Sequence, residues 1–476
     1  MGISFTRRKI LKLGAASGAP LIVPAHLFGA DAPSNRIQVG VIGCGRIAAS
    51  MDIPGLAQNP ESATLVALAD CDRVRLDSMV RRAKRVYGDN PLPELKTATD
   101  YHELLADPAI DAVMICTPDF CHAEICIEAA LAGKDIYVQK PLTMTIDEGR
   151  MIVDTVKKTG RVFHIGSQQR SEGRSTFGPQ FRKAAEYVRD GRLGKILRVE
   201  VGLPSDPQEP KDAPLVQPVP ATFNYDRWLG STPLAPYSEL RTHPQGKDGE
   251  ANYGRPGWMT IQAYDMGMIA NWGAHHLDIV QWALDMEGSG PIAIEGRAEF
   301  PKRRLWDVHG KLDVSLTYAN GTVVRVTGTD VFPNGVRFIG EKGWIFCSRN
   351  SEKAIEGIPS AGGKHGRWRP LEASDSALIT GEVAHPVVRN PLSHHRVWLD
   401  SIKSRRPTNI PVESAHRSTS ACILAYTAMN LGRPLKWDPA NERFIDDDEA
   451  NRTLSRPERA PYGARNALRR AEAKEG

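Results

Sequence analysis

The chain has 476 residues, of which 25% are charged, and a net charge of +5. This length is enough for two domains with additions. Lysines and arginines are dispersed and form no basic run interleaved with aromatic residues, so the sequence argues against nucleic-acid binding. The seven cysteines include no C-x-x-C pair. Because most of them lie in apolar segments, we expect buried free thiols rather than disulfides.

The first 32 residues resemble an export signal. Arg7 and Arg8 form a twin-arginine pattern, a mildly apolar stretch covers residues 13–28, and residues 30–32 offer small side chains for cleavage. The alternative is a frayed N-terminal arm. Two prolines interrupt the apolar stretch, so we expect no stable membrane insertion. We therefore expect a periplasmic or otherwise exported protein that folds before it crosses the membrane.

Residues 35–165 alternate short apolar runs with amphipathic segments. This alternation predicts βαβ units and a doubly wound parallel sheet, which is an α/β fold. The expected strands cover residues 36–42, 64–69, 111–116, 135–138 and 161–165. The expected helices cover residues 73–86, 101–106, 119–132 and 146–158. We expect Asp119 to cap the third of these helices.

A G-x-G-x-x-A loop at residues 43–48 follows the first strand. Gly43 allows a tight turn and Gly45 lets the backbone approach a pyrophosphate, while the next helix begins with its positive end there. Asp70 ends the second strand, where an acid binds ribose hydroxyls and favours NAD over NADP. The predicted cofactor-binding residues in this part are Gly43, Gly45, Arg46, Ile47 and Asp70.

The pattern changes after residue 194. We expect a domain at residues 166–436 with a mainly antiparallel sheet backed by helices, because Asn320-Gly321 is a strong hairpin signal. Its expected strands cover residues 195–202, 291–300, 310–318 and 322–328. Residues 203–222 and 351–381 are predicted to be long surface loops. A charged tail at residues 437–476 is predicted to wrap the surface or a partner subunit.

Seven segments together resemble the Gfo/Idh/MocA family of oxidoreductases. They are residues 43–48, 116–122, 139–142, 166–170, 228–230, 271–278 and 412–417. The resemblance covers nearly all of the chain after the signal. It implies a Rossmann domain followed by an α/β domain whose open sheet supports a homo-oligomer, a dimer or a tetramer. It also implies an NAD(P) cofactor and a sugar or polyol substrate.

The resemblance assigns the lysine of the family's E-K-P motif to Lys140, near the nicotinamide. Such a lysine polarises an oxygen or passes a proton when its pKa lies near the working pH; the alternative is a solvated surface lysine. Gln139 replaces the motif's glutamate, so we expect a lower lysine pKa unless another acid compensates. Thr117, Pro118 and His122 are expected to line the cofactor together with Gln139 and Lys140, with local packing as an equal alternative for His122.

The family's D-x-x-x-H motif falls on Asn271 and His275. A spacing of four places both side chains on one helix face, with His275 as proton acceptor or, alternatively, as a structural histidine. Asn271 orients a ligand but cannot titrate. His276 and Asp278 either contact substrate or brace the helix. We expect no zinc site here, because adjacent histidines on a helix point about 100° apart.

Three functions remain open from the sequence. The first is hydride transfer between nicotinamide and a sugar, polyol or glycoside, with Lys140, His275 and Asn271 at the reacting carbon and a tightly held NAD cycled without net redox change. The second is a glycoside hydrolase or lyase that acts through transient oxidation and elimination. The third is a non-catalytic homologue that binds nucleotide or sugar. The expected substrate-binding residues are Arg170, Tyr264, Trp272 and His276.

Overall fold

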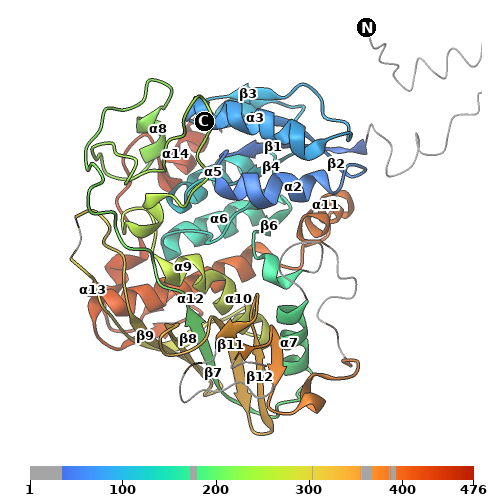
Figure 1. The fold of residues 1–476 in the computed structure, drawn as a ribbon, viewed down its shortest axis with the longest axis vertical. Helices are drawn as coiled ribbons and strands as arrows, with labels where there is room; N and C mark the ends of the chain where they lie inside the picture. Colours follow the sequence, from blue (N-terminus) through green and yellow to red (C-terminus); the bar gives the residue numbers. More distant parts are fainter. Residues whose placement is uncertain are drawn as a thin grey trace, which may run out of the picture.

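The computed structural model describes residues 35–475 except 172–178, 303, 354, 356–366, 385 and 387–392. The predicted export signal lies outside this part. Two sheets occupy opposite ends of the molecule, and helices fill the space between them (Figure 1). In the part that the structure describes, none of the helices combines the length and the apolar character needed to span a bilayer.

The first sheet has six parallel strands in the order β3-β2-β1-β4-β5-β6. This confirms the predicted doubly wound sheet, although the sequence analysis missed the short strand β3. The strands are β1 (Ile37–Ile42), β2 (Ala63–Ala69), β3 (Lys96–Ala98), β4 (Ala112–Ile115), β5 (Asp135–Val138) and β6 (Phe163–Ile165). The strand order reverses between β1 and β4, which is where nucleotides bind in such sheets.

The helices of this domain begin close to their predicted positions. They are η3 (Ala48–Asp52), α2 (Ile53–Ala57), α3 (Arg73–Tyr87), α4 (His102–Ala106), η4 (Asp119–Cys121), α5 (His122–Leu131) and α6 (Ile146–Thr159). A capping box joins Thr145 and Glu148 at the start of α6. The prediction that Asp119 caps a helix is wrong, since α5 begins after Cys121 and the Asp119 side chain caps nothing.

The second sheet has nine strands in the order β15-β12-β11-β7-β10-β9-β8-β16-β17. All neighbours are antiparallel except β7 and β10, so the sheet is mixed but mainly antiparallel, as predicted. The strands are β7 (Ile196–Leu203), β8 (Pro291–Ala298), β9 (Leu312–Tyr318), β10 (Val323–Gly328), β11 (Gly335–Gly340), β12 (Gly343–Cys347), β15 (Leu371–Ala373), β16 (Leu435–Asp438) and β17 (Arg443–Phe444). Asn320-Gly321 turns β9 into β10, with Gly321 at a φ of 84°.

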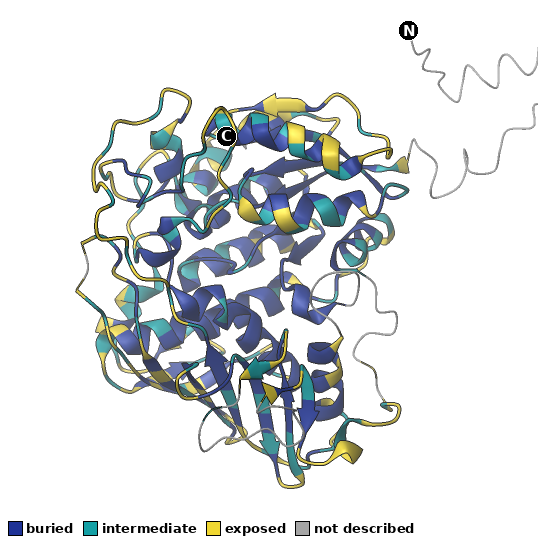
Figure 2. Cartoon of the chain, viewed as in Figure 1, coloured by how far each residue is buried: buried dark blue, intermediate teal, exposed yellow. Residues whose placement is uncertain are grey.

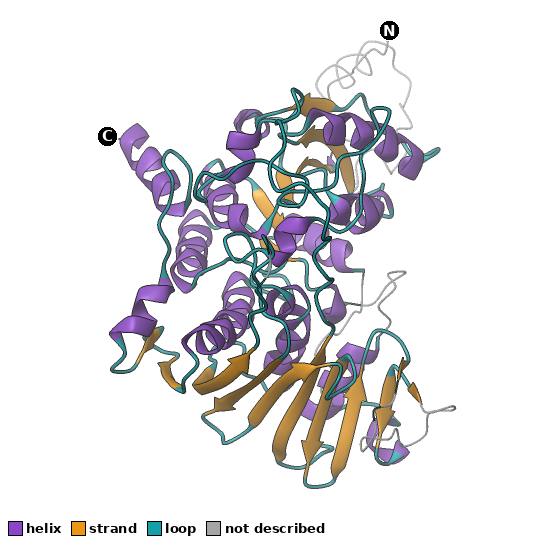
Figure 3. Ribbon diagram, turned by 60° about the vertical axis from the view of Figure 1, so that its left-hand side comes forward, coloured by secondary structure: helices purple, strands orange, loops and turns teal. Residues whose placement is uncertain are grey.

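Helices cover one face of this sheet (Figure 3). They include α7 (Gln180–Arg189), α10 (Gly273–Ala283) and α12 (Val412–Leu431), and α12 also contacts α6 of the first domain. The helices between the two sheets are mostly buried (Figure 2). The remaining elements are η5 (Gln168–Arg170), α8 (Tyr225–Leu229), η6 (Gly257–Thr260), α9 (Met268–Asn271), β13 (Glu352–Lys353), β14 (Arg367–Trp368), η8 (Ser376–Ile379) and α11 (His394–Ser404).

The described part of residues 351–381 is not simply a loop, because β13, β14, β15 and η8 lie within it. The charged tail forms α13 (Asp448–Asn451), η9 (Arg452–Leu454) and α14 (Ala464–Glu475). Helix α14 packs against α5, where Arg470 pairs with Glu124 and Glu128. The tail therefore covers the first domain of its own chain. Helix α11 packs there too, through Trp398 in the core around β1.

Candidate active site

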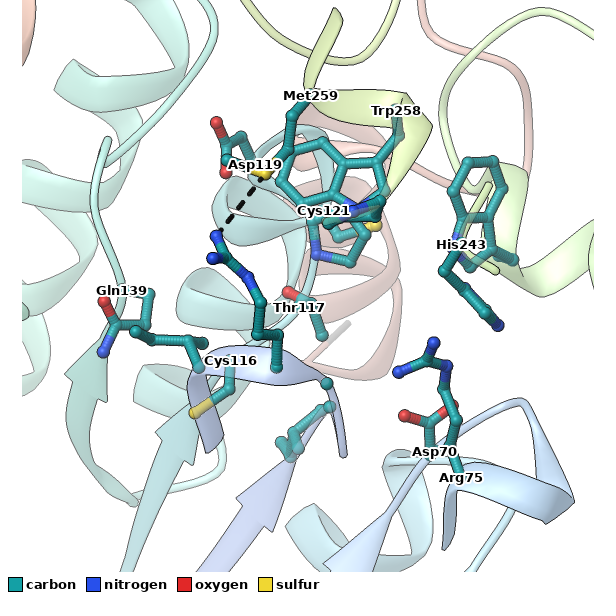
Figure 4. A pocket seen from close by; sticks show the side chains of 18 of the residues that line it. Asp70, Arg75, Cys116, Thr117, Asp119, Cys121, Gln139, His243, Trp258 and Met259 are labelled. Carbon is teal, nitrogen blue, oxygen red and sulfur yellow. Dashed lines mark hydrogen bonds between the residues drawn. The ribbon is translucent and has the colours of Figure 1, made fainter. Parts of the chain in front are cut away.

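A cavity of about 380 Å³ opens at the carboxyl ends of β1, β2, β4 and β5. Figure 4 shows Asp70, Arg75 and His243 on one side of it and Gln139 on the other. The predicted residues that line it are Gly43, Gly45, Arg46, Ile47, Asp70, Thr117, Pro118, Gln139, Lys140, Asn271, Trp272 and His275. The sequence motifs thus converge on one site, although they come from both domains.

The glycine loop fits a bound pyrophosphate. Gly43 has a φ of +94°, and a Cβ there would lie 2.7 Å from the backbone carbon of Cys116, so no larger residue is tolerated. A Cβ on Gly45 would meet nothing closer than 3.9 Å, because this glycine borders the cavity. The buried hydroxyl of Thr117 also has no hydrogen-bond partner among the described residues. These features are what a dinucleotide requires of its site.

Asp70 is anchored beside this loop. Its carboxylate accepts hydrogen bonds from the backbone N–H groups of Cys44 at 2.7 Å and Asp72 at 2.8 Å. Burial and the neighbouring Asp72 raise the pKa of Asp70 to about 6. The carboxylate is therefore largely ionised at neutral pH and is held in a fixed orientation at the cavity, at the position where an acid accepts hydrogen bonds from ribose hydroxyls in Rossmann domains.

Lys140 follows β5 and lines the cavity. Burial is the largest cause of its lowered pKa, and Arg349 and Arg46 act in the same direction. Asp119 and Asp265 oppose them. The lowered pKa follows from burial and the two arginines, while the two aspartates partly replace the charge that the glutamine at position 139 does not supply. A lysine in this setting exchanges protons more readily near neutral pH than a solvated one.

Gln139 has a different partner from the one its motif implies. Its Nε2 donates to both carboxylate oxygens of Asp52, at 3.0 and 2.8 Å. The ring of His395 lies against the same carboxylate, with Nε2 at 3.1 Å. The Gln139 amide therefore points to η3 and α11 and forms one edge of the cavity, rather than pairing with the lysine that follows it.

Asn271 and His275 both line the cavity, but their helix is interrupted. Trp272 separates α9 from α10, which corrects the expected continuous helix. Burial, Arg349 and Lys140 lower the pKa of His275 well below its ordinary value. Its imidazole is therefore neutral at physiological pH, and its Nδ1 has no partner in the described part of the chain. It is available for a hydrogen bond to a substrate hydroxyl.

Arg170 does not reach the cavity. It is fully buried, and its guanidinium binds the Asp278 carboxylate at 2.5 and 2.7 Å and the Glu287 carboxylate at 2.5 Å. Ser418 of α12 donates to Asp278 as well, at 2.8 Å. This placement does not fit the prediction that Arg170 faces substrate, since its guanidinium binds Asp278 of α10 and Glu287 beyond the end of that helix. Asp278 braces this junction of η5 with α10.

Three further predicted residues also lie behind the cavity wall. His276 lies 3.0 Å from the side-chain oxygen of Asn334 and packs on Phe181. Tyr264 packs in a buried aromatic cluster with Trp228. His122 contacts two carbonyl oxygens, that of Pro141 at 2.8 Å and that of Thr117 at 3.1 Å. His122 thus takes the packing role that the sequence left open, and its ring holds two cavity-lining segments together.

Several residues of the site were not found from the sequence. Asp119 lines the cavity, and its Oδ2 has no hydrogen-bond partner among described residues. Burial and Asp265 raise its pKa well above the ordinary value. Asp119 lies inside a recognised motif, so its role could have been found there. The others lack a local signal: Asp265, Arg255, Trp258, Met259, Arg349 and Tyr462 come from distant segments.

One such segment, residues 243–254, forms a strap along α3. Arg75 donates to the carbonyl of Asn252 at 2.8 Å, and the backbone N–H of Ala251 donates to the Ser78 hydroxyl at 2.8 Å. Arg81 donates to the carbonyl of Gly249 at 2.8 Å. Both ends of the strap line the cavity near Asp70. The second domain therefore closes over the nucleotide side of the first.

The histidines and acids of α10 do not converge on a metal. His276 is turned to Asn334, and Asp278 is turned to Arg170, so neither points the same way as His275. Within the described ranges, no cluster of three histidine, cysteine or acidic side chains has the arrangement of a metal site.

Comparisons with known proteins agree with this site. A model described as the oxidoreductase family's NAD-binding Rossmann fold matches residues 37–167. A second, described as the oxidoreductase family's C-terminal alpha/beta domain, matches residues 208–360 and 377–464. The NAD(+)-dependent scyllo-inositol 2-dehydrogenase of Bacillus subtilis (strain 168) is 31% identical over 163 residues, which are 34% of this chain and 43% of that protein. The chain spans about half the length of the curated relatives it matches.

Two solved structures share the fold at low sequence identity. Levoglucosan dehydrogenase in complex with NADH and levoglucosan has a TM-score of 0.57 at 17% identity, over 84% of this chain and 99% of that one. The aldose-aldose oxidoreductase from Caulobacter crescentus, complexed with glycerol, has a TM-score of 0.56 at 19% identity, again over 84% and 99%. Both matches extend over nearly the whole of the solved chains.

Proposed function

Because the chain belongs to the Gfo/Idh/MocA oxidoreductase family, we propose that it transfers a hydride between a nicotinamide cofactor and a hydroxyl-bearing carbon of a sugar, polyol or glycoside. The observation that carries this proposal is the convergence of Lys140, Asn271 and His275 on one cavity with the glycine loop. The names of its relatives, which include inositol and levoglucosan dehydrogenases, support the substrate class.

NAD is the proposed cofactor. Gly43 and Gly45 admit the pyrophosphate, and the fixed carboxylate of Asp70 accepts hydrogen bonds from ribose hydroxyls while it repels a 2′-phosphate. Thr117 and Pro118 line the cavity after β4 and would contact the nicotinamide half. When bound, this cofactor supplies the acceptor or donor of the hydride. The protein's own groups then have to orient the substrate and move one proton.

Lys140 moves that proton in this proposal, and His275 holds the hydroxyl that carries it. Neutral His275 and the free oxygen of Asn271 orient the substrate hydroxyl by hydrogen bonds. Lys140, whose pKa is lowered, accepts the proton during oxidation or returns it during reduction. Asp119 also lines the cavity. In its ionised form it places a negative charge near the Lys140 amine, and in its protonated form it places a proton there. Trp272 adds an aromatic surface for a sugar face.

The cofactor is proposed to be held tightly and cycled without net redox change. One substrate is oxidised, and a second carbonyl compound is reduced before the cofactor leaves. The strap at residues 243–254 supports this, because its hydrogen bonds to α3 would have to break before the adenosine side could open. The fold shared with an aldose-aldose oxidoreductase fits such a cycle.

A substrate screen tests the proposal. The protein, purified without added nucleotide, is mixed with single sugars, polyols and glycosides while absorbance near 340 nm, the signal of reduced nicotinamide, is followed. We expect a single burst of absorbance with a true substrate and its reversal on addition of an aldose or ketose. Product analysis separates the alternative: glycosidic cleavage with no net redox change would assign the hydrolase or lyase activity. No absorbance change and no cleavage with any compound would contradict both.

We also propose export by the twin-arginine route, with the cofactor already in place. The support is the sequence pattern around Arg7 and Arg8. Fractionation of cells that express the full chain, compared with the Arg7→Lys/Arg8→Lys variant, tests this. The native chain should lie outside the cytoplasm and the variant inside. Equal distribution of the two would contradict export by this route.

A homo-oligomer, a dimer or a tetramer, is proposed to form on the sheet face that no described helix covers (Figure 3). This face carries the exposed ion pair of Arg325 with Asp313, and beside it Arg337, paired with Glu200, lies over the buried aromatic cluster of Phe332, Phe346 and Trp368. A polar interface is sensitive to salt. Light scattering at low and high salt tests this proposal, and a monomer under all conditions would contradict it.

A further inference from the structure

The amide of Asn271 is held in one orientation by its surroundings. Its Nδ2 donates to the Asp265 carboxylate at 2.8 Å and to the carbonyl of Gly267 at 3.1 Å. A reversed amide would place an oxygen against these two acceptors, which is repulsive. The Asn271 oxygen is therefore left over, and it has no partner among the described residues. It is the only atom of this side chain that can accept a hydrogen bond from a ligand.

The acid that fixes this amide is itself completely buried. Asp265 lies in the turn before α9, six residues ahead of Asn271, and has no exposed surface. Its second oxygen accepts the backbone N–H of Gly267 at 3.0 Å. Burial raises the pKa of Asp265 to about 7, against the opposing effects of Lys140 and Asn271. Buried acids with raised pKa values are common at reaction sites, and the hydrogen bond that Asp265 accepts from Asn271 links this acid to the cavity.

The charges around this acid form one electrostatic group. The charged side chains that shift the pKa of Lys140 are Asp119, Asp265, Arg349 and Arg46. Those that act on Asp265 are Lys140, Asp206 and Arg255. Lys140 or Asp265 also acts electrostatically on four further groups, which are His122, His275, Cys422 and Tyr426. Within this group, Asp265 contacts Asn271, which occupies the acid position of the D-x-x-x-H motif. Asp265 also raises the pKa of Lys140.

We propose that the carboxylate of the D-x-x-x-H motif has been displaced from position 271 to Asp265, which acts on the reaction as a positioning residue through Asn271 and Lys140. Asn271 presents to the substrate hydroxyl the acceptor oxygen that an aspartate would present, and Asp265 supplies the negative charge one hydrogen bond further away. The carboxylate has then moved to Asp265 and is not lost, so the amide at position 271 is not a sign of lost activity. This inference rests on the proposed function, since it concerns the same site.

An exchange of the two side chains tests the proposal. The variants are Asp265→Asn, Asn271→Asp and the double exchange Asp265→Asn/Asn271→Asp, each checked for cofactor content and melting temperature. Asp265→Asn removes the charge and lets the amide at position 271 turn its N–H₂ to the substrate. Asn271→Asp places two carboxylates within hydrogen-bond distance, where both cannot ionise freely. Each single variant should lower kcat/KM at least about tenfold. The double exchange restores one charge and one hydrogen bond between positions 265 and 271, but it loses the N–H that Gly267 accepts, so it should be at least about threefold more active than either single variant without reaching the native value.

A second readout does not depend on turnover. Lys140, labelled by reductive methylation with ¹³C and assigned through Lys140→Arg, is titrated by NMR in each variant. Its pKa should fall in Asp265→Asn and return in the double exchange. Native protein with no activity on any compound, but with this shift, would contradict the proposed function and leave the displaced acid supported. An unchanged Lys140 titration and unchanged kcat/KM in Asp265→Asn would overturn the inference. If the double exchange fails to fold, the titration in Asp265→Asn alone decides.

Discussion

Lys140 is the side chain on which the proposed chemistry depends most. It lines the cavity, and burial lowers its pKa while Asp119 and Asp265 oppose that shift. Removal of its amine should leave the glycine loop and the Asp70 carboxylate unchanged. The variant Lys140→Met is therefore expected to retain bound nucleotide and to lose about 10²- to 10⁴-fold in the rate of hydride transfer. Single-turnover absorbance near 340 nm measures the rate.

The matched control for this variant is Lys158→Met, which removes an exposed lysine at the end of α6. It should retain both nucleotide and rate. Loss of nucleotide from Lys140→Met would indicate that the lysine holds the cofactor rather than moves a proton. An unchanged rate in Lys140→Met would contradict its proposed role.

The raised pKa of Asp265 also has a consequence for stability. An acid that titrates at about 7 in the folded protein and near 4 when unfolded binds more protons in the folded state between these values. Its contribution to stability therefore falls as the pH rises from about 4 to 7 and is constant above that. The melting temperature of the native protein, relative to Asp265→Asn, should fall across this window. A difference that is constant with pH would contradict the raised pKa.

At the residue level, sequence motifs located the site better than they located the direction of each side chain. Lys140, Asn271 and His275 line the cavity as expected, because their positions follow strand ends and a helix start. Arg170 and His276 belong to equally recognisable segments but point into the protein. Their direction depends on partners far away in the chain, such as Asn334, which no local pattern reveals.

At the level of elements, the junction of η5 with α10 is held by a buried ion pair. Arg170 binds Asp278 and Glu287, and its guanidinium lies over the ring of Trp282 at 4.9 Å. Removal of one partner from such a pair leaves an uncompensated buried charge and costs about 3–5 kcal/mol. Arg170→Met should therefore lower the free energy of unfolding by about this amount in denaturant titrations. At temperatures where it stays folded, its KM for substrate should be unchanged.

A raised KM in Arg170→Met without loss of stability would restore the original prediction that Arg170 binds substrate. The exposed pair of Arg73 and Asp77 on α3 provides the control. Arg73→Met should change stability by less than about 1 kcal/mol, because exposed ion pairs contribute little.

The strap makes a separate prediction about cofactor release. Ser78→Ala/Arg81→Ala removes hydrogen bonds from α3 to Gly249 and Ala251 without touching the cavity lining. Each lost hydrogen bond costs about 1 kcal/mol, so NAD should dissociate about tenfold faster or more. Exchange of bound NAD for a fluorescent analogue measures this rate. Arg85→Ala, an exposed position on the same helix, should leave it unchanged; equal rates in all three proteins would contradict a role for the strap.

The order and type of the main elements could be predicted because apolar periodicity and Gly-based turn signals are local. The strands β1, β2, β4 and β5 and the hairpin between β9 and β10 were found in this way. Short strands such as β3 and β17 form through pairing with neighbours and were missed. The break at Trp272 was also missed, although Gly273, a poor helix former, follows it directly.

The whole molecule is more interwoven than two successive domains. Helix α12 contacts both α6 and β8, α11 packs into the core around β1, and α14 packs on α5. The chain thus returns to the first domain at α11, before β16 and β17 complete the second sheet, and again at α14. Since the strap also joins the two parts, opening of the nucleotide site requires a change in several contacts at once. This arrangement favours a protein that acquires its cofactor during folding and keeps it afterwards.

The most direct test of this account is the nucleotide content of the purified protein. The protein is prepared without added cofactor and denatured, and the supernatant is assayed enzymatically for NAD(H) and NADP(H). We predict close to one NAD(H) per chain and almost no NADP(H), because Asp70 disfavours a 2′-phosphate and the strap slows release. An empty protein that binds added NAD readily would contradict tight retention. An empty protein that also fails to bind added NAD or NADP would contradict the proposed hydride transfer itself.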